Sequence, residues 1–486
     1  MNKLFFVFIL LAFTLPSLSQ KLTGTSEKFS GFPYPGIATR GNFNYSFKKS
    51  IIYIGQEEAI FTVSSSKKDD ESVVKMNASM NVIWQTPIQD KILFISRLKN
   101  KILVISTPDW KKSHNKLIRK INAAILDPST GKVVGEKLIF ENSSHFYIDP
   151  DFMSDENNYF QGLLIRHTNA KRVSYTYKGD VKKGSTNQLD IISIDEGLAV
   201  QIRTLTTRLG DEDMAYIGCA MNKKEEIFIV GYSNNILIAE KYAANGVAPI
   251  AELSVIYEAR RVSRKYGILN INESGDFLAV AVEYRNPKDD HSIITALFNF
   301  AEKKSYQQDE QFTKAHQREL KMSYLDDLEV SSVQFYGDKI IVSKETQPFE
   351  SPRTPGGTLR YESYQIIVSV YDKQLKLLKN LYLGRYYQSF LPEHKFAGYA
   401  INGHLLHVLF SDVAGPEQYK TVFAEIDLVS PDIIRQNVVL ERGDGDKRAI
   451  IEPAACLWFD KILILPYSIL NGTGKEDAIF QKIILN

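Results

Sequence analysis

Few residues of the sequence stand at spacings that could do chemistry. The stretch HLLH contains His404 and His407, and in a strand side chains at this separation point to opposite faces, so the two imidazoles cannot share a metal ion. The stretch RGDGDK, residues 442–447, offers carboxylates that could hold calcium, but it lacks the twelve-residue ligand order of an EF-hand. We interpret the histidines as packing or edge residues and RGDGDK as a polar turn, and we predict no bound metal.

Recognisable catalytic motifs are also missing. The sequence has no nucleophile elbow, phosphate-binding loop or zinc-protease helix, and Cys219 and Cys456, its two cysteines, lack the spacing of a catalytic or zinc site. Single Asp and Glu residues are too numerous to select an acid–base pair without geometry. We therefore predict no cofactor and assign no catalytic residue, and we favour a protein without enzymatic activity while leaving that question open.

These residues are distributed along a chain of repeated β-hairpins. Residues 123–140, AAILDPSTGKVVGEKLIF, read as two strands around a turn that Asp127-Pro128 opens and Gly131 completes. An apolar run, a polar break and a second apolar run recur, with turns near Asn77, Asp127, Asp195, Ala243, Phe300, Asp372 and Asp427. A second series of hairpins, among them 92–107 and 395–412, lies between the members of the first.

The two series together predict the fold class. Four antiparallel strands repeated along a chain are the blade pattern of an all-β, β-propeller fold, and we count eight four-stranded blades, with seven as the alternative. A large β-sandwich or two unrelated β domains would also show short strands with regular turns. One order of strands and loops fits nearly the whole chain without a dividing linker, so we favour a single propeller domain over residues 20–486.

The last repeat lacks a strand. After the hairpin at 452–468, only residues 478–486 remain, which are enough for a third strand but not for a fourth. Residues 40–49, RGNFNYSFKK, alternate Phe43, Tyr45 and Phe47 with polar residues. We predict that this N-terminal strand completes the last blade and covers its open edge.

Two further structural expectations follow from the repeat count. Cys219 and Cys456 fall in the innermost strands of the fourth and eighth blades, across the ring from each other and beyond the roughly 7 Å that a disulfide spans, so we expect two buried free thiols. Residues 303–331, between the fifth and sixth repeats, place Phe312, Ala315, Leu320 and Leu328 at roughly helical spacing. We predict a short helix there.

The turn LDPSTGK resembles that of quinoprotein-type propellers. In those proteins an Asp, a Thr-Gly-Lys and, eight residues after the Asp, a docking Trp recur in most blades. Here the eighth position after Asp127 is Gly135, while Trp84 follows Asn77 by seven residues. The resemblance covers two of the eight repeats and implies blade geometry, not a quinone cofactor.

The first residues and the net charge limit the cellular location of the protein and the kinds of partner it can have. Met1–Ser19 has an early lysine, an apolar core of LFFVFILLAFTL and then Pro16 and small residues, which predicts a cleavable signal peptide too short for a membrane span. No cysteine lies near the cleavage site, so we do not expect a lipid anchor. We expect a secreted or periplasmic protein that is not membrane-spanning, and the formal net charge of +2 argues against nucleic acid as its partner.

Loop length predicts where a partner binds. In antiparallel blades of strands A to D, the A–B and C–D turns share one face of the disc, and the B–C loops and D–A connections share the other. The latter include the long segments 107–120, 168–188, 347–363 and 383–394, and long loops inside compact domains tend to be functional. Their Trp, Tyr and Arg residues are of the types that anchor partners. The candidate binding residues are Trp110, Tyr175, Tyr177, Arg353, Arg360, Tyr361, Arg385, Tyr386 and Tyr387.

Two classes of function stay open. The first is a non-catalytic binding or scaffolding propeller of the cell envelope or the extracellular space, which recognises a protein or glycan on its long-loop face. The alternative is a secreted polysaccharide hydrolase or lyase with its site at the central channel. An enzyme would show ionisable groups with opposed pKa shifts in one deep pocket, and a scaffold would show a broad surface.

Overall fold

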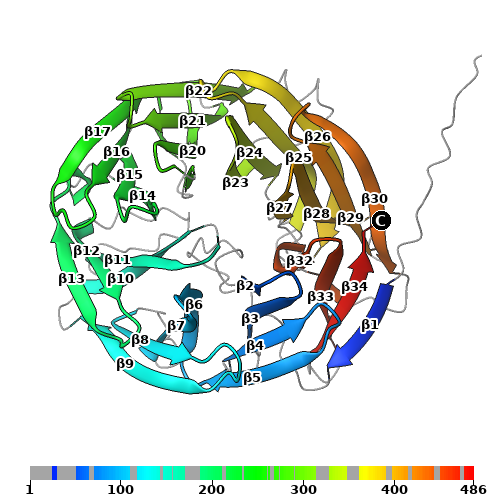
Figure 1. Ribbon diagram of the computed structural model, residues 1–486. Helices are drawn as coiled ribbons and strands as arrows, with labels where there is room; N and C mark the ends of the chain where they lie inside the picture. Colours follow the sequence, from blue (N-terminus) through cyan, green and yellow to red (C-terminus); the bar gives the residue numbers. More distant parts are fainter. Residues whose placement is uncertain are drawn as a thin grey trace, which may run out of the picture.

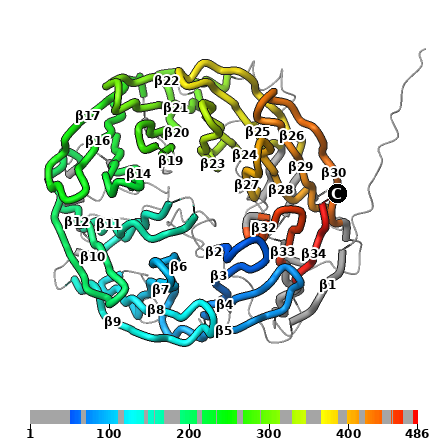
Figure 2. Tube along the Cα trace, in the orientation of Figure 1, coloured from blue at the N-terminus to red at the C-terminus, as the bar shows by residue number. Residues whose placement is uncertain are grey.

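In the computed structural model, the chain forms a closed ring of β-sheets (Figure 1). The structure describes residues 24–29 and 51–485, apart from 65–70, 110–117, 143–145, 156, 170–185, 211–214, 233–234, 260, 263–266, 273, 289, 314–327, 347–360, 390–396, 414–418, 443–448, 452 and 471–475. Successive sheets follow one another around the ring in chain order, as the colours from blue to red show (Figure 2). The predicted eight-bladed propeller of four-stranded antiparallel blades is confirmed.

Among the described residues the eight blades contain 34 strands, and each blade runs from an inner strand A to an outer strand D. Blade 1 consists of β2 (Ile51–Ile54), β3 (Glu58–Ser64), β4 (Glu71–Asn77) and β5 (Val82–Ile88), and blade 2 consists of β6 (Lys91–Leu98), β7 (Lys101–Thr107), β8 (Lys120–Leu126) and β9 (Val133–Glu141). Blade 3 consists of β10 (Phe146–Ser154), β11 (Phe160–Asn169), β12 (Thr186–Ile194) and β13 (Val200–Leu205), and blade 4 consists of β14 (Ala215–Met221), β15 (Ile227–Tyr232), β16 (Ile236–Tyr242) and β17 (Pro249–Ile256).

In blades 5 and 8 the inner strand is split into two short pieces. Blade 5 consists of the split inner strand β18 (Arg261–Val262) and β19 (Ile268–Ile271), then β20 (Phe277–Arg285), β21 (His291–Asn299) and β22 (Lys304–Phe312), and blade 6 consists of β23 (Leu328–Tyr336), β24 (Lys339–Thr346), β25 (Tyr361–Tyr371) and β26 (Leu377–Ser389). Blade 7 consists of β27 (Gly398–Asn402), β28 (Leu405–Val413), β29 (Tyr419–Asp427) and β30 (Asp432–Arg442). Blade 8 consists of the split inner strand β31 (Ala449–Ile451) and β32 (Leu457–Phe459), then β33 (Ile462–Leu470), β34 (Glu476–Ile484) and β1 (Gly24–Phe29).

An N-terminal strand closes the ring, but it is not the predicted one. Strand β1, Gly24–Phe29, pairs antiparallel with β34, so that the first and last strands of the chain lie together in blade 8 (Figure 1). The prediction of a closing strand is therefore confirmed, and its assignment to residues 40–49 is wrong; Phe43, Tyr45 and Phe47 lie outside the described residues. The free edge of β34 selects its partner by backbone pairing, which the aromatic alternation of 40–49 could not reveal.

The helix predicted for residues 303–331 is also incorrect in part. Phe312 ends strand β22, whose nine residues all pair with β21, and Leu328 begins β23. Ala315 and Leu320 lie outside the described residues. Pairing with a neighbouring strand outweighed a helical spacing that rested on four apolar positions, and the count of eight blades is unaffected.

Burial explains why each sequence forms its strand. The middle strands are covered on both sides, and all nine residues of β21 are buried, which matches their continuous apolar character. Outer strands alternate, as in β17, where exposed positions such as Ile250 and Glu252 take turns with half-buried ones. The core lies at the seams between blades, where Phe94 stacks on Phe152 with ring centroids 4.6 Å apart.

The residues that suggested a repeat motif make a contact between blades 1 and 2. The Trp84 indole Nε1 donates a hydrogen bond to the Pro128 carbonyl oxygen at 3.1 Å, and its ring covers Gly131. Gly131 has φ of 71°, and a Cβ there would lie 2.7 Å from the Trp84 ring, so glycine is required by both backbone and space. The predicted turn thus serves as a docking site for the preceding blade.

Other blades make the equivalent contact with different side chains. Lys137 of β9 donates to the Leu198 carbonyl at 3.0 Å, and Arg203 of β13 donates to the Gly246 carbonyl at 3.3 Å. In each case the outer strand of one blade reaches the C–D turn of the next. The contact position therefore recurs where the tryptophan does not.

Candidate binding face

The two sets of connections between strands lie on opposite faces of the disc. The A–B and C–D turns are short, such as residues 337–338 between β23 and β24, whereas residues 170–185 join β11 to β12 and residues 347–360 join β24 to β25. We call the face that carries the B–C and D–A connections the long-connection face. The longest connections between the described strands lie on this face, as predicted, although residues 89–90 and 233–235 on the same face are as short as the turns of the other face.

Side-chain caps hold the turns of the opposite face. The Asn77 Oδ1 accepts hydrogen bonds from the Ser79 and Asn81 amides at 3.0 and 2.9 Å, and the Asp372 Oδ1 accepts from Gln374 and Lys376 at 2.8 and 2.9 Å. Such turns satisfy their own backbone donors. This face is consequently a set of small self-contained turns with little chain to offer a partner.

Five of the predicted binding residues lie outside the described residues: Trp110, Tyr175, Tyr177, Arg353 and Arg360. Each belongs to a connection whose flanking strands end on the long-connection face. Their role in binding stays a prediction.

The other four predicted residues lie in strands, and their assignment to loops is wrong. Tyr361 begins β25, and Arg385, Tyr386 and Tyr387 belong to β26, because these two strands pair as far as Tyr361 opposite Ser389. Arg385 is only 3% exposed. Its guanidinium is buried and is therefore not available as a surface anchor.

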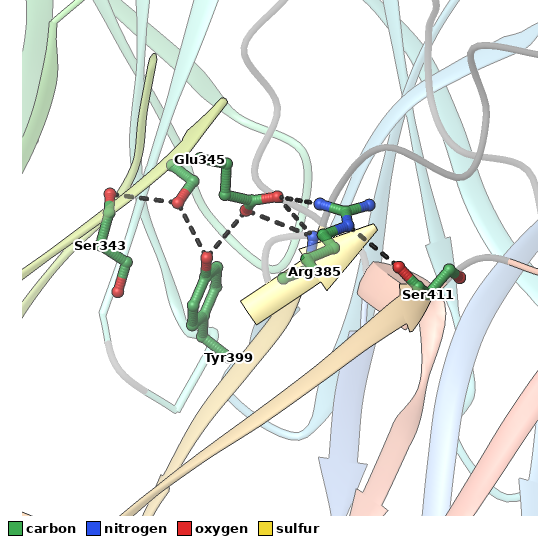
Figure 3. Close-up of polar contacts among 7 residues, drawn as sticks. Ser343, Glu345, Arg385, Tyr399 and Ser411 are labelled. Carbon is green, nitrogen blue, oxygen red and sulfur yellow. Dashed lines mark hydrogen bonds and ion pairs between the residues drawn. The ribbon is translucent and has the colours of Figure 1, made fainter. Parts of the chain in front are cut away.

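Arg385 belongs to a buried polar array between blades 6 and 7 (Figure 3). Its Nη1 lies 3.0 Å from the Oε2 of Glu345, and its Nε donates to the Ser411 carbonyl oxygen at 3.0 Å. The Glu345 carboxylate also accepts from the Ala397 amide at 3.1 Å and from the Tyr399 hydroxyl at 2.8 Å. One carboxylate thereby joins strands β24 and β26 of blade 6 to the inner strand of blade 7.

The array is built for structure rather than for proton transfer. Burial, and then the neighbouring Glu345 carboxylate, raise the pKa of Tyr399 well above its ordinary value, so its hydroxyl stays protonated and donates to Glu345. Glu345 is 4% exposed. The sequence signal for this array was the pair of charged residues Lys344-Glu345 at the end of the apolar run KIIVS, which sequence reasoning did not use.

The centre of the ring is tied together by the β10–β11 hairpin of blade 3, which reaches toward the middle of the ring (Figure 1). At its tip, the Asn158 Nδ2 donates to the Ile51 carbonyl of blade 1 at 3.0 Å, and the Asn158 carbonyl accepts from the Ser96 hydroxyl of blade 2 at 2.6 Å. Asn158 is buried, with φ of 60°. One turn therefore connects the inner parts of three blades.

The inner strand of blade 3 carries the carboxylates nearest to what an enzyme would need. Asp149 pairs with Arg166 of β11, Asp151 accepts a hydrogen bond of 2.7 Å from the Tyr216 hydroxyl, and the Arg166 guanidinium lies 4.5 Å from the centre of the Tyr216 ring. Burial raises the pKa of the Asp149 carboxyl, Arg166 opposes this, and Asp151 adds to it. Two carboxylates on one inner strand are the type of side chain that acid–base catalysis uses.

The remaining sequence candidates are placed as follows. Cys219 and Cys456 are both buried and neither forms a disulfide, as expected. His407 is a buried strand residue, His404 lies in the preceding turn, and residues 443–448 of RGDGDK lie outside the description. Within the described part of the chain, no group of three His, Cys, Asp or Glu residues could hold a metal ion, and no helix there has the length and apolar character to cross a membrane.

Comparison with known proteins adds nothing at the level of family. No protein-family model and no curated protein matches the sequence. Among solved structures, the WD40 domain of SCAP from fission yeast is similar at 9% identity and a TM-score of 0.41, over 96% of this chain and 98% of that one. The Dos1 propeller is similar at 9% identity and a TM-score of 0.47, over 88% and 91%.

Prolyl oligopeptidase B from Galerina marginata is also similar, at 9% identity and a TM-score of 0.41, over 90% of this chain and 56% of the peptidase. Domains from a WD40 protein and from a peptidase thus match to a similar degree. At such low identity and similarity, these structures carry no argument about the activity of this protein.

Proposed function

We propose that this protein is a non-catalytic binding or scaffolding propeller that recognises a protein partner through its long-connection face. A propeller fold supports a binding or scaffolding role in general. The predicted signal peptide, Met1–Ser19, supports a location outside the cytoplasm, in the periplasm or the extracellular space. The partner would then be an envelope or extracellular protein, with a glycan as the alternative.

The segregation of the connections is the observation that carries this proposal. The strand bounds place all the long connections on one face, while the opposite face consists of short turns. Long connections on a rigid scaffold are where binding residues concentrate. The connections also contain Trp, Tyr and Arg, which supply most of the binding energy at protein interfaces.

The test compares alanine substitutions on the two faces. The chain from residue 20 onward would be used to capture its partner from the cell envelope, and affinity for the captured protein would then be measured. We expect Arg353→Ala and Arg360→Ala each to weaken binding by about thirtyfold, the value for a loss of about 2 kcal/mol. The paired substitution of Lys223 and Lys224, in the A–B turn of blade 4 on the opposite face, should leave affinity unchanged. Equal losses from both faces would contradict the proposal, and capture of a polysaccharide instead of a protein would select the glycan.

A second function is favoured by one observation, the carboxylate pair Asp149 and Asp151. The raised pKa of Asp149 and the position of the carboxylate pair on an inner strand fit a polysaccharide hydrolase or lyase with a site at the ring centre. The test is release of reducing ends or of unsaturated sugars from acidic and neutral polysaccharides, by the wild type and by Asp149→Asn. Activity that disappears in the variant would establish the enzyme, and its absence from the wild type would leave the binding function alone.

A further inference from the structure

The ring is closed at blade 8 by two strands from opposite ends of the chain, which lie side by side on the rim of the disc (Figure 1). All six residues of β1, Gly24–Phe29, stand opposite residues of β34, from Ile483 to Ala478, in one antiparallel register without a shift. The edge of a strand presents N–H and C=O groups that pair with an extended segment. The edge of β34 is therefore a strand-binding site, and β1 is the segment that occupies it.

The way in which β1 is joined to the chain distinguishes it from the other outer strands. In blades 1 to 7 the outer strand follows the third strand after a short turn, from residues 78–81 in blade 1 to residues 428–431 in blade 7. β1 has no such turn to β34, because the seven other blades lie between them in the sequence, and residues 30–50 separate it from β2. The position of β1 beside β34 therefore depends on strand pairing and not on a short covalent link.

Two copies of the chain can exchange this strand without loss of pairing. On the β34 of a second copy, β1 makes the same six residue pairs that it makes with its own β34. The two arrangements differ in the entropy of closing the chain, which depends only weakly on the length of the connection. A tethered segment has an effective concentration of about 1 mM, so a second copy competes for the site as the protein concentration approaches that value.

We propose that the edge of β34 is an intermolecular strand-binding site whose partner is β1 of a second copy of this chain. Reciprocal exchange uses the same surface of both copies, so it gives a closed two-fold dimer in which both rings keep their closing strand. The site lies on the rim of the disc (Figure 1) and is independent of the long-connection face. It adds a contact between two copies of the protein to the partner proposed above.

The first test traps the exchanged strand with a disulfide. Ser26 stands opposite Gln481, and the Cα atoms of directly opposed residues lie within the distance that a disulfide spans. Chains with Ser26→Cys and chains with Gln481→Cys, carrying different tags, would be mixed at about 0.1 mM, a tenth of the effective concentration. Oxidised glutathione would be added, which is reduced as the two thiols join. We expect a covalent dimer that carries both tags, because each exchange brings the two cysteines together.

A matched control uses a blade whose outer strand has a short turn. Ile236 of β16 stands opposite Ile256 of β17, the first half-buried and the second exposed, and residues 243–248 join the two strands. A mixture of Ile236→Cys and Ile256→Cys chains should form almost no covalent dimer, because exchange here requires blade 4 to open. Equal yields of doubly tagged dimer from the two mixtures would overturn the proposal.

The double variant Ser26→Cys/Gln481→Cys tests the site within one chain. Oxidised while dilute, it should form an internal disulfide that holds β1 on its own β34. Failure to form this disulfide would also overturn the proposal, because residues 24–29 would then not occupy the edge of β34.

The second test asks whether exchange explains the dimer of the unmodified chain. Sedimentation of the chain from residue 20 onward at about 0.01 mM and about 0.1 mM, both below the effective concentration, should show a dimer whose fraction rises about tenfold between them by mass action. The oxidised double variant should stay monomeric at both concentrations, and reduction should restore the dimer. A wild type without a dimer, or a dimer that persists in the oxidised variant, would refute strand exchange.

Discussion

Lys344 and Glu345 are consecutive residues of β24 that make buried ion pairs on opposite faces of blade 6. Lys344 faces blade 5 and pairs with Glu310 of β22, and Glu345 faces the seam with blade 7, where Ala397 and Tyr399 bond it. Each carboxylate also accepts a hydrogen bond from a tyrosine hydroxyl, Tyr371 at Glu310 and Tyr399 at Glu345.

The two pairs are thus alike in burial and chemistry and differ in the atoms they join. The first joins side chains within the sheets, and the second joins main-chain atoms beside the connections. Consecutive side chains of a strand point to opposite faces of the sheet, and this alternation decides which seam a buried charge meets. The charge then bonds either side chains within that seam or main-chain atoms at the strand ends.

The largest expected effect is on stability, from Lys344→Met. The substitution leaves the Glu310 carboxylate, whose side chain is 15% exposed, without the buried Lys344 cation, and breaking a buried pair in this way costs about 3–5 kcal/mol. Chemical denaturation would measure the loss of unfolding free energy. Adding Glu310→Gln should recover most of the loss, because the unpaired charge is then removed; no recovery would show that packing, not charge, explains the effect.

A smaller effect, which sharpens the comparison, is expected from the two tyrosines. Tyr371→Phe and Tyr399→Phe each remove one hydrogen bond to a carboxylate, which contributes about 1.5–3 kcal/mol when the acceptor is charged. Both variants should lose stability by similar amounts. Chemical denaturation would measure both losses of unfolding free energy, and a clearly larger loss in one variant would show that the two tyrosines do not contribute equally to their seams.

The smallest expected effect concerns pH at the next seam, between blades 7 and 8. The His407 ring packs against Trp458 of blade 8, 5.9 Å between centroids, with its Nε2 3.3 Å from the Glu425 carboxylate, which also pairs with Arg435. Burial lowers the pKa of His407; Glu425 raises it and Arg435 lowers it. The unfolded chain therefore binds a proton more readily than the folded one, so stability falls as the pH drops below the ordinary histidine value of about 6.5.

Replacing His407 with glutamine should remove this part of the pH dependence. Melting temperatures of wild type and variant between pH 5 and pH 8 would be compared, and the difference between them should grow toward pH 5 in favour of the variant. Parallel curves would mean that other groups cause the acid destabilisation.

Local signals account for the part of the fold that the sequence predicted. Turn residues such as Asn77, Asp127 and Asp372 accept hydrogen bonds from the amides two to four residues ahead, and this chemistry is readable in a short window. Repeating those windows gives the blades and their order. Connection length, and with it the long-connection face, follows from the same count.

Non-local pairing accounts for what the sequence did not predict. The closing strand GTSEKF has a weak apolar pattern, and it is selected by the free edge of β34 at the far end of the chain. Arg385 was read as a loop residue because RYYQS is polar and aromatic, yet β25 and β26 pair through it and Glu345 neutralises its charge. A partner 40 positions away leaves no trace in local spacing.

The closing pair has a mechanical consequence. Gly24 lies opposite Ile483 and Phe29 lies opposite Ala478, so the start of β1 and the end of β34 lie side by side. A force that pulls these two strand ends apart breaks the backbone hydrogen bonds between β1 and β34 one after another. It never loads all of these hydrogen bonds together in shear. In the other blades, short turns link strand C to strand D and prevent this separation. Tension between the two ends of the protein would therefore open blade 8 first, at low force, while the other seven blades remain folded.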